Sequence, residues 1–321
     1  MRLYSVVIPV YNRPAEINEL LESLTRQTYD HFEVLVIEDG STDTCKHIVE
    51  SFQDRLDVSY YYKENSGQGF SRNYGYQRAT GDYFVVFDSD CIIPPHYFEA
   101  VEKHLNAAYL DAYGGPDKAH GSFTVIQKAI SYSMTSLFTT GGIRGRKQHI
   151  GTFHPRSFNM GISREVFEQT NGYIIPYMGE DIEFSIRIIE GGFITGLISD
   201  AYVYHKRRTS LGQFFRQLHF FGRARINVSR FYKTELKPVH FFPLLFLLGV
   251  VLYLFLPLIN LQWFVWASLL FAIYFFLIFI DATLKNKSLT VGLLSIAASF
   301  IQLSAYGIGF LTEGLRKIFK G

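Results

Sequence analysis

The first 208 residues alternate between short apolar runs and amphipathic stretches. The segment "RLYSVVIPVYN" is rich in β-branched residues and predicts a strand, and "PAEINELLESLTRQT" predicts a helix. One face of this helix carries four apolar residues: Ile17, Leu20, Leu21 and Leu24. "FEVLVIEDGSTDT" repeats the pattern, with an apolar strand over 34–37 and a following helix that Ser41 or Thr42 is expected to cap.

Two more units continue the alternation. "DVSYYYKEN" and "DYFVVFD" predict the third and fourth strands, and "SGQGFSRNYGYQRATG" between them predicts a helix. Strands that are apolar along their whole length and alternate with helices predict a mainly parallel α/β sheet covered on both faces. Ligands bind such sheets beyond the carboxyl ends of the strands.

The C-terminal part has a different pattern. No Asp, Glu, Lys or Arg occurs from His240 to Ile280, or from Ser288 to Thr312. Three apolar segments, approximately 241–259, 263–281 and 289–311, are each near the ~20 residues that cross a bilayer. We therefore expect a transmembrane region over 238–321.

The charges between these segments predict their orientation. The joint near Asn260 is uncharged, whereas the joint at 285–287 is basic, so the first two segments are expected to form a hairpin whose tip faces away from the cytoplasm. A third span would place Arg316 and Lys317 outside, against the positive-inside rule. Three spans are expected, with the third left open.

Residues 209–237 are basic and aromatic. With the three residues before them, they hold nine cations against the single acid Glu235: Lys206, Arg207, Arg208, Arg216, Arg223, Arg225, Arg230, Lys233 and Lys237. A basic, aromatic-rich helix directly before an apolar run predicts an interfacial helix on an anionic leaflet. Nucleic-acid binding is disfavoured by the apolar segments and by the net charge of only +2 over 321 residues.

The cysteines and the N-terminus bear on the compartment. Cys45 and Cys91 form no pattern of a zinc site or a disulfide framework, which favours a reducing compartment. The first nine residues lack the apolar region of a signal peptide. The N-terminal domain is therefore expected in the cytoplasm.

Two carboxylates follow the fourth strand in "FVVFDSDCI". Asp88 and Asp90 at the edge of a core repel one another, so a cation is expected beside them. Glu38 and Asp39 follow the second strand and Asn65 follows the third, and these side chains are predicted to meet Asp88 and Asp90 at one edge of the sheet. Oxygen ligands of this kind suit Mg²⁺ or Mn²⁺, although Asp88 and Asp90 are also typical residues for capping a turn.

"GQGFSR", residues 67–72, is the competing motif. It follows a strand and opens a helix, with Asp88 downstream, as in a dinucleotide-binding fingerprint. The third glycine is replaced by Arg72, however, and the turn belongs to the third strand-to-helix unit rather than the first. A dinucleotide site is therefore disfavoured.

Two later segments add candidate chemistry. In "MGEDIEFSIRIIEGG", Glu180 and Asp181 fall in the first turn of a predicted helix, where acids are common and where a general base would be held rigidly. The strand in "DAYVYHKRR" ends in His205, which is either a structural residue or a group that completes the shell of a metal.

These motifs, in order and spacing, resemble the inverting family 2 glycosyltransferases of the GT-A fold. The resemblance covers about residues 4–208 and rests on "VVIPVYN", "EDGSTD", "GFSRNYGYQRATGDYFVVFDSD", "GED" and "YHKR". It implies a nucleotide-sugar-binding domain over 1–208, which precedes the interfacial helix and the transmembrane region.

The resemblance also implies site residues. Asp39 would contact the nucleotide base in a pocket lined by Pro9 and Tyr11, and Arg72 would border the donor site without an assigned role. Three residues would hold Mg²⁺ or Mn²⁺ on the diphosphate: Asp88, Asp90 and His205. Asp181 would be the base that deprotonates the acceptor hydroxyl.

The expected protein is a multi-pass enzyme of the inner cell membrane that moves one sugar from a nucleotide-sugar donor to a lipid-linked or growing glycan acceptor. A processive polysaccharide synthase is the alternative, but "QFFRQ" has Gln217 where those enzymes carry Trp, and three spans are few for a polymer channel. A non-catalytic module of the same fold remains open. A transporter subunit is disfavoured because Asp281 is the one ionisable group in the predicted spans.

Overall fold

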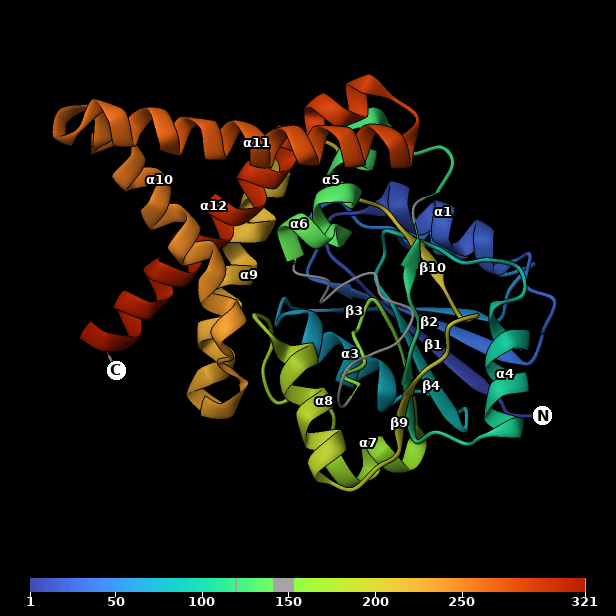
Figure 1. The fold of residues 1–321 in the computed structure, drawn as a ribbon. Coiled ribbons are helices and arrows are strands. Elements are labelled where there is room, and N and C mark those ends of the chain that lie inside the picture. Colours follow the sequence, from blue (N-terminus) through green and yellow to red (C-terminus); the bar gives the residue numbers. More distant parts are fainter. Residues whose placement is uncertain (119, 141–152, 321) are drawn as a thin grey trace. The chain divides into compact units, whose positions relative to one another are not determined.

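The computed structural model of the protein describes residues 1–118, 120–140 and 153–320. The chain divides into two compact units, which are described separately (Figure 1). The first unit comprises residues 1–120 and 148–206, and the second comprises 121–147 and 207–321.

The first unit is built on a seven-stranded sheet in the order β3-β2-β1-β4-β8-β6-β9. β8 is antiparallel to β4 and β6, and the other neighbours in the sheet are parallel. The strands are β1 (Tyr4–Val10), β2 (Phe32–Asp39), β3 (Val58–Lys63), β4 (Tyr83–Phe87), β6 (Ala112–Gly114), β8 (Asn159–Ser163) and β9 (Thr195–Leu197). The predicted mainly parallel sheet is confirmed.

The last strand of the same unit belongs to a second, smaller sheet. It has three strands in the order β5-β10-β7, namely β5 (Cys91–Ile92), β10 (Val203–His205) and β7 (Asp117–Lys118). β10 pairs antiparallel with β5, so that His205 lies opposite Cys91. This pairing brings the predicted strand end at His205 beside the segment that follows β4.

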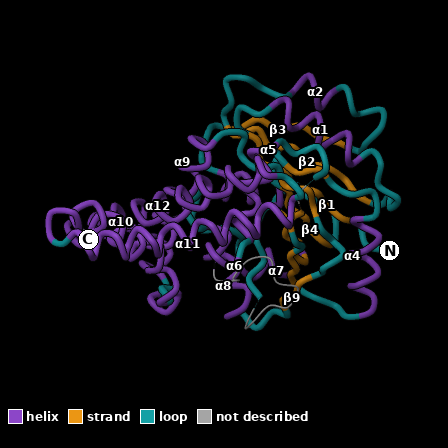
Figure 2. The backbone as a smooth tube through the Cα atoms, turned by 45° about the horizontal axis from the view of Figure 1, so that its top comes forward, coloured by secondary structure: helices purple, strands orange, loops and turns teal. Residues whose placement is uncertain are grey.

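Helices cover both faces of the main sheet, as the fully apolar strands predict (Figures 1 and 2). One face packs against α1 (Pro14–Leu24), α2 (Lys46–Glu50) and α4 (Tyr97–Ala107). The other packs against α3 (Gln68–Tyr76), α7 (Arg164–Thr170) and α8 (Glu180–Glu190). The four apolar residues predicted on one face of α1 are all buried.

The predicted cap at Ser41 or Thr42 is wrong, because α2 begins at Lys46 after Cys45. Both hydroxyl residues are instead bound to the loop that follows β1. Asn12 N–H donates to Ser41 Oγ at 2.7 Å, and Asn12 Oδ1 accepts from the backbone N–H of Thr42 at 2.9 Å. Ser and Thr side chains that can cap a helix can also form hydrogen bonds between loops. Here the partner is Asn12 in the loop after β1.

The two glycines of "GQG" leave space for the chain at Ile175 and Pro176, which is distant in sequence. A Cβ built on Gly69 would lie 2.4 Å from Ile175 O, and one on Gly67 would lie 2.8 Å from Pro176 Cβ. Gly69 N–H donates to Pro176 O at 2.9 Å, and Gly67 has a φ of +93°. The glycines therefore allow the chain before α8 to approach the start of α3, which explains them without a dinucleotide.

The second unit is helical. Its described residues form α5 (Val125–Thr135), α6 (Leu137–Thr140), α9 (Leu211–Phe231), α10 (Phe242–Ile259), α11 (Leu261–Asn286) and α12 (Leu289–Lys320), with two 3-10 turns at Lys233–Glu235 and Pro238–Phe241. Within the described part of the chain, three segments are long and apolar enough to cross a membrane: Pro238–Ile259, Leu261–Asn286 and Leu289–Phe319. The predicted C-terminal apolar helices are thus present.

The predicted interfacial helix over 209–237 corresponds to α9. Its apolar side chains Phe214 and Leu218 are 0% and 4% exposed. They pack in one cluster with Ile130 of α5 and with Ala298 and Ala305 of α12. These apolar residues therefore face protein within the second unit and are not available to a lipid surface.

Gly69→Ala should destabilise the protein by about 1–3 kcal/mol, because the new methyl group overlaps the backbone at Ile175. Gly212→Ala is the matched control: it is also the second residue of a helix, but no atom lies within 4 Å of its Cβ position. The control should be neutral or slightly stabilising. Thermal unfolding of the full chain in detergent measures both variants. Equal unfolding midpoints would contradict the claim that Gly69 is needed for the close approach of Ile175.

Candidate active site

The predicted acids lie at the carboxyl edge of the main sheet. Asp39 ends β2, and Asp88 directly follows β4. Strands β2 and β3 are added on one side of β1, whereas β4 is added on its other side, so the strand order reverses between β1 and β4. Residues 11–13 follow β1 and lie at this switch point. Ligands of open α/β sheets bind at such a position.

Asp90 is held between two basic side chains. Arg13 Nη1 lies 2.8 Å from Asp90 Oδ2, and His205 Nε2 lies 2.9 Å from Asp90 Oδ1. The Asp90 side chain is 7% exposed. The backbone N–H of Lys206 also donates to Asp90 O at 3.0 Å, which fixes β10 beside the turn.

Arg72 joins the other acids of the site. Its guanidinium is fully buried and lies 3.0 Å from Asp88 Oδ1 and 3.2 Å from Glu180 Oε1. Burial alone would lower the pKa of Arg72, but the ring of Tyr173 and the two carboxylates outweigh it and raise the pKa. The cations expected beside Asp88 and Asp90 are thus supplied, in the described residues, by two arginines of the chain.

The two acids of "GED" have different surroundings. The Glu180 side chain is 4% exposed and accepts hydrogen bonds from Arg72 and Gln68 of α3. Burial raises the pKa of Glu180, and the neighbouring Asp181 adds to this, while Arg72 acts in the opposite direction. Glu180 therefore anchors the start of α8.

Asp181 faces outward. Its side chain is 21% exposed, its Oδ1 accepts from Ile182 N–H at 2.8 Å, and its Oδ2 lies 3.3 Å from Arg156 Nη1. The preceding Gly179 has a φ of +100°, a conformation that suits glycine and turns the chain into α8. Of the two acids, Asp181 is the one that a substrate hydroxyl can reach.

Asp39 is fixed by three donors. Lys63 Nζ lies 2.6 Å from Oδ1, and the backbone N–H groups of Ser66 and Gly67 each donate to the carboxylate at 2.9 Å. Burial opposes ionisation, but Lys63 and Ser66 outweigh it, so the pKa of Asp39 lies below its ordinary value of 3.8. The carboxylate is charged and oriented before any ligand binds.

The remaining predicted site residues differ in access. Tyr11 is 53% exposed at the end of β1, where its ring is open to a ligand. Pro9 is buried inside β1 opposite Ile37. The structure therefore brings Tyr11, but not the ring of Pro9, to the accessible part of this edge.

A metal site can be tested on the residues beside β5. Asp90, Cys91 and His205 each offer one ligand atom, and these atoms lie within 4.8 Å of one another. Burial, together with Asp90 and Asp88, raises the pKa of the Cys91 thiol well above its ordinary value. A thiol is also a soft ligand, which suits Mg²⁺ and Mn²⁺ less well than carboxylate oxygens do. A carboxylate and an imidazole fit Mn²⁺, which takes its remaining ligands from water and phosphate.

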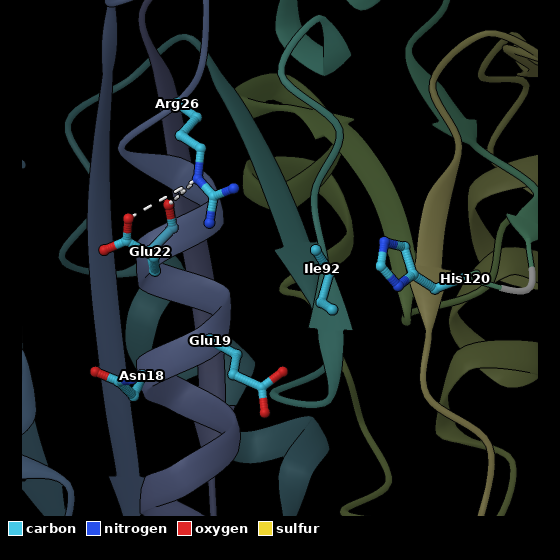
Figure 3. A pocket seen from close by; sticks show the side chains of 6 residues that line it. All are labelled: Asn18, Glu19, Glu22, Arg26, Ile92 and His120. Carbon is cyan, nitrogen blue, oxygen red and sulfur yellow. Dashed lines mark hydrogen bonds and ion pairs between the residues drawn. The ribbon is translucent and has the colours of Figure 1, made fainter. Parts of the chain in front are cut away.

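A separate hollow lies beside α1 and β5 (Figure 3). It measures about 240 Å³ and is lined by Asn18, Glu19, Glu22, Arg26, Ile92 and His120. Two of its acids are already paired, Glu19 with Lys206 at 2.5 Å and Glu22 with Arg55 at 2.9 Å. Because its lining includes none of the predicted site residues, it is not the candidate site.

Sequence reasoning missed the cations of this edge. Arg13 follows the first strand and Lys63 ends the third, so the rule that located the acids would also have located them. Their partners lie 77 and 24 residues away along the chain. The pairings themselves carry no local signal in the sequence.

Arg72→Gln should lower the free energy of unfolding by about 3–5 kcal/mol, because Glu180 would remain buried without its cation. Arg78→Gln is the control: Arg78 is exposed near the end of the same helix and contacts the rings of Tyr74 and Tyr61, a contact worth about 0.5–1 kcal/mol. Thermal unfolding followed by circular dichroism compares them. Similar losses in both variants would refute the structural role of Arg72.

The ion pair of Asp39 should make stability depend on pH. Because the pKa of Asp39 is lower in the folded chain, unfolding takes up a proton as the pH falls below about 4, and the stabilisation is lost through the folded pKa. Asp39→Asn should therefore be less stable than the native chain at pH 7, with a difference that shrinks toward pH 3. The exposed Asp54→Asn should show no such convergence.

Comparison with known proteins identifies the family of the chain. The sequence profile described as "Glycosyl transferase family 2" matches residues 5–170. Validoxylamine A glucosyltransferase from Streptomyces hygroscopicus subsp. jinggangensis is 38% identical over 121 residues, which cover 36% of this chain and 27% of that protein. Glycosyltransferase GlyG from Streptococcus pneumoniae serotype 4 is 30% identical over 127 residues, which cover 38% and 42%.

Solved structures show the same fold. Mannosyltransferase PcManGT from Pyrobaculum calidifontis, in complex with GDP-Man and Mn²⁺, aligns with a TM-score of 0.59 at 18% identity and covers 99% of this chain and 88% of that one. S. aureus TarS 1-349 in complex with UDP-GlcNAc aligns with a TM-score of 0.50 at 18% identity, covering 97% and 92%. The matched profile spans just over half of the sequence, and the chain therefore belongs to glycosyl transferase family 2.

Proposed function

We propose that the protein is a membrane-anchored inverting glycosyltransferase that moves one sugar from a nucleotide-sugar donor to a lipid-linked or growing glycan acceptor. The observation that carries this proposal is the double ion pair of Arg72. It contacts Asp88 on one side and Glu180 on the other, so the acid after β4 lies close to the start of α8, where Asp181 is exposed. Donor and acceptor groups can then meet in one place.

Asp181 is proposed as the general base. Its carboxylate takes the proton of the acceptor hydroxyl while the oxygen attacks the anomeric carbon. The bond between that carbon and the diphosphate breaks in the same step, and a single displacement inverts the anomeric centre. Arg156 lies against one carboxylate oxygen and Ile182 N–H against the other, which holds Asp181 in one orientation.

The donor is proposed to bind over the ends of β1 and β2. The exposed ring of Tyr11 can stack on the nucleotide base. Asp39, fixed by Lys63 and the backbone of 66–67, can accept a hydrogen bond from the base without reorganising. Pro9 contributes through the shape of the strand that precedes Tyr11, because its ring is buried.

The charge balance favours a donor that binds with a cation. Five carboxylates lie at this edge, Asp39, Asp88, Asp90, Glu180 and Asp181, and they are paired with four permanent cations, Lys63, Arg72, Arg13 and Arg156. Among the residues that the structure describes, none of these four cations is left unpaired to neutralise a diphosphate. A bound Mn²⁺ or Mg²⁺, held by Asp90 and His205 with Asp88 nearby, would stabilise the charge on the departing diphosphate.

Membrane attachment follows from the second unit. The most apolar stretches of Pro238–Ile259 and Leu261–Asn286 are 0% and 6% buried. Such exposed apolar helices suit a lipid environment, which would bring a lipid-linked acceptor to the protein. We further propose that the bilayer is the inner membrane and that the first unit is cytoplasmic, because the residues before α10 are basic.

A donor screen with the purified full chain tests the proposed function. PcManGT was solved with GDP-Man and TarS with UDP-GlcNAc, so GDP-, UDP- and dTDP-sugars are tried first, each with Mn²⁺ and with a chelator. Release of nucleoside diphosphate that requires the metal and a lipid-linked acceptor is the expected result. Tight donor binding without release would instead favour a non-catalytic module.

Two substitutions should separate chemistry from binding. Asp181→Asn should leave donor affinity nearly unchanged but lower kcat by ~10²-fold or more, because only proton abstraction is lost. Asp90→Asn should weaken metal-dependent donor binding. Calorimetric titration and initial rates measure the two effects, and a reversed pattern would show that the roles are assigned wrongly.

A further inference from the structure

The helices α10 and α11 form a hairpin whose outer half is apolar and exposed. Tyr253 stacks on Phe264 at 5.1 Å, and its hydroxyl lies 3.0 Å from Ser268 Oγ, so the two helices pack side by side up to their joint at Asn260. Large apolar residues near this joint are 45–84% exposed: Leu248, Val251, Leu252, Leu254, Phe255, Leu258, Ile259, Leu261, Trp263, Val265, Trp266, Leu269 and Leu270. The hairpin tip has the surface of a membrane insertion.

The third apolar helix, α12, does not run along this hairpin. Its first half contacts the end of α11, where a Cβ built on Gly292 would lie 2.0 Å from Thr283 Oγ1. Phe300 then contacts both legs, with ring distances of 6.4 Å to Phe275 and 5.9 Å to Phe246. Further on, Phe310 lies 5.1 Å from the ring of Phe241.

These contacts give α12 its direction. It starts beside the end of α11 and reaches the start of α10, and these two helix ends form the base of the hairpin. A straight helix can satisfy this only by crossing the base of the hairpin. If α10 and α11 pass through a bilayer, α12 therefore lies near the plane of one leaflet.

The neighbour of α12 on its other side supports the same arrangement. α9 runs beside α12 in the same direction: a Cβ on Gly222 would lie 2.1 Å from Tyr306 O, and Lys317 Nζ lies 3.1 Å from Ser229 Oγ (Figure 1). α9 carries four arginines: Arg216, Arg223, Arg225 and Arg230. A spanning α12 would draw these arginines into the hydrocarbon, where charged side chains are costly.

The exposed surface of α12 fits a helix in the plane of the membrane. Leu289, Leu293, Phe300, Leu311, Leu315 and Ile318 are 38–74% exposed. At about 100° per residue they fall within a sector of about 80°. Ala298, Ala305, Gly309 and Glu313, which lie against α9 or in the cluster shared with it, are on the opposite side. The helix thus has one apolar face for lipid and one face for a basic partner.

A cluster of cations lies at the edge of this pair. Glu313 is contacted by Arg223 at 3.1 Å, Arg230 at 2.9 Å and Arg316 at 3.7 Å. Lys317 adds a further positive charge. One carboxylate leaves most of this charge unbalanced, and it suits anionic headgroups at the membrane surface.

We propose that only α10 and α11 cross the bilayer, and that α12 lies in one leaflet with its apolar stripe among the acyl chains. The arginines of α9 and α12 then lie at the level of the anionic headgroups. This arrangement places the C-terminus on the same side as the start of α9 and removes the conflict between three spans and the positive-inside rule. It does not depend on the assigned catalytic residues.

The depth of paired positions tests the proposal in the full chain, reconstituted in vesicles of phosphatidylcholine and phosphatidylglycerol. Leu293→Cys and Leu311→Cys lie on the stripe, 18 residues and therefore about 27 Å apart along the axis. Nitroxides at both positions should be equally accessible to a nickel chelate that is added to one side of vesicles in which the chain has a single orientation. A spanning helix would place them in opposite halves of the membrane.

Leu245→Cys and Leu258→Cys on α10 form the matched control, separated by about 20 Å along the axis. They should differ in their accessibility to the chelate added to one side, with Leu258 on the far side. The proposal is overturned if the α12 pair differs as much as the α10 pair, since α12 would then cross. It is equally overturned if the α10 pair shows no difference, since the hairpin would not cross.

The sidedness of the C-terminus gives an independent readout. Thr209→Cys, Gln262→Cys and Phe319→Cys lie in exposed positions, whereas the native Cys45 and Cys91 are buried and set a low background. Sealed cells are first treated with a membrane-impermeant maleimide and then opened for a second label. Phe319→Cys and Thr209→Cys should react in the same labelling step, and Gln262→Cys should react in the other step. If Phe319→Cys reacts in the same step as Gln262→Cys, the proposal is refuted.

Discussion

The first unit depends on one buried cation. Arg72 is fully buried, and a guanidinium in that position is tolerated only where carboxylates compensate its lost hydration. The two that do so are Asp88 after β4 and Glu180 at the start of α8, which are 16 and 108 residues away. The same side chain therefore joins the sheet edge to the helix that carries Asp181. Removing it would leave two acids of the site without their common partner.

The glycines of α3 make this contact possible. Arg72 can meet Glu180 only because the chain before α8 approaches the start of α3, where Gly67 and Gly69 leave space for Ile175 and Pro176. In a dinucleotide-binding turn, glycines let the backbone approach a pyrophosphate. Here they let it approach another segment of the same protein. A glycine pattern indicates close approach, and the identity of the approaching group has to come from elsewhere in the fold.

The periodic features of the fold could be predicted from the sequence, because they are local. Strands β1 to β4, the buried face of α1 and the first turn of α8 all follow from spacing, and so does the meeting of Asp39 and Asp88 at one edge. The pairings could not be predicted. Ser41 was expected to cap a helix, but Asn12 from another loop binds it. The partners of Asp90 and of α9 likewise come from distant parts of the chain.

The two units differ in the sign of the charge that their buried ion pairs leave unbalanced. In the first, Arg13, Arg72, Lys63 and Arg156 are each paired with a carboxylate, and this pairing is the reason for proposing that a diphosphate binds there together with a divalent cation. In the second, Glu313 is surrounded by more cations than it can neutralise. In the proposed arrangement, that surplus faces anionic headgroups and the adjoining apolar stripe of α12 contacts the acyl chains. The balance of charge around a few buried groups is therefore a physical difference between the proposed donor site and the proposed membrane surface.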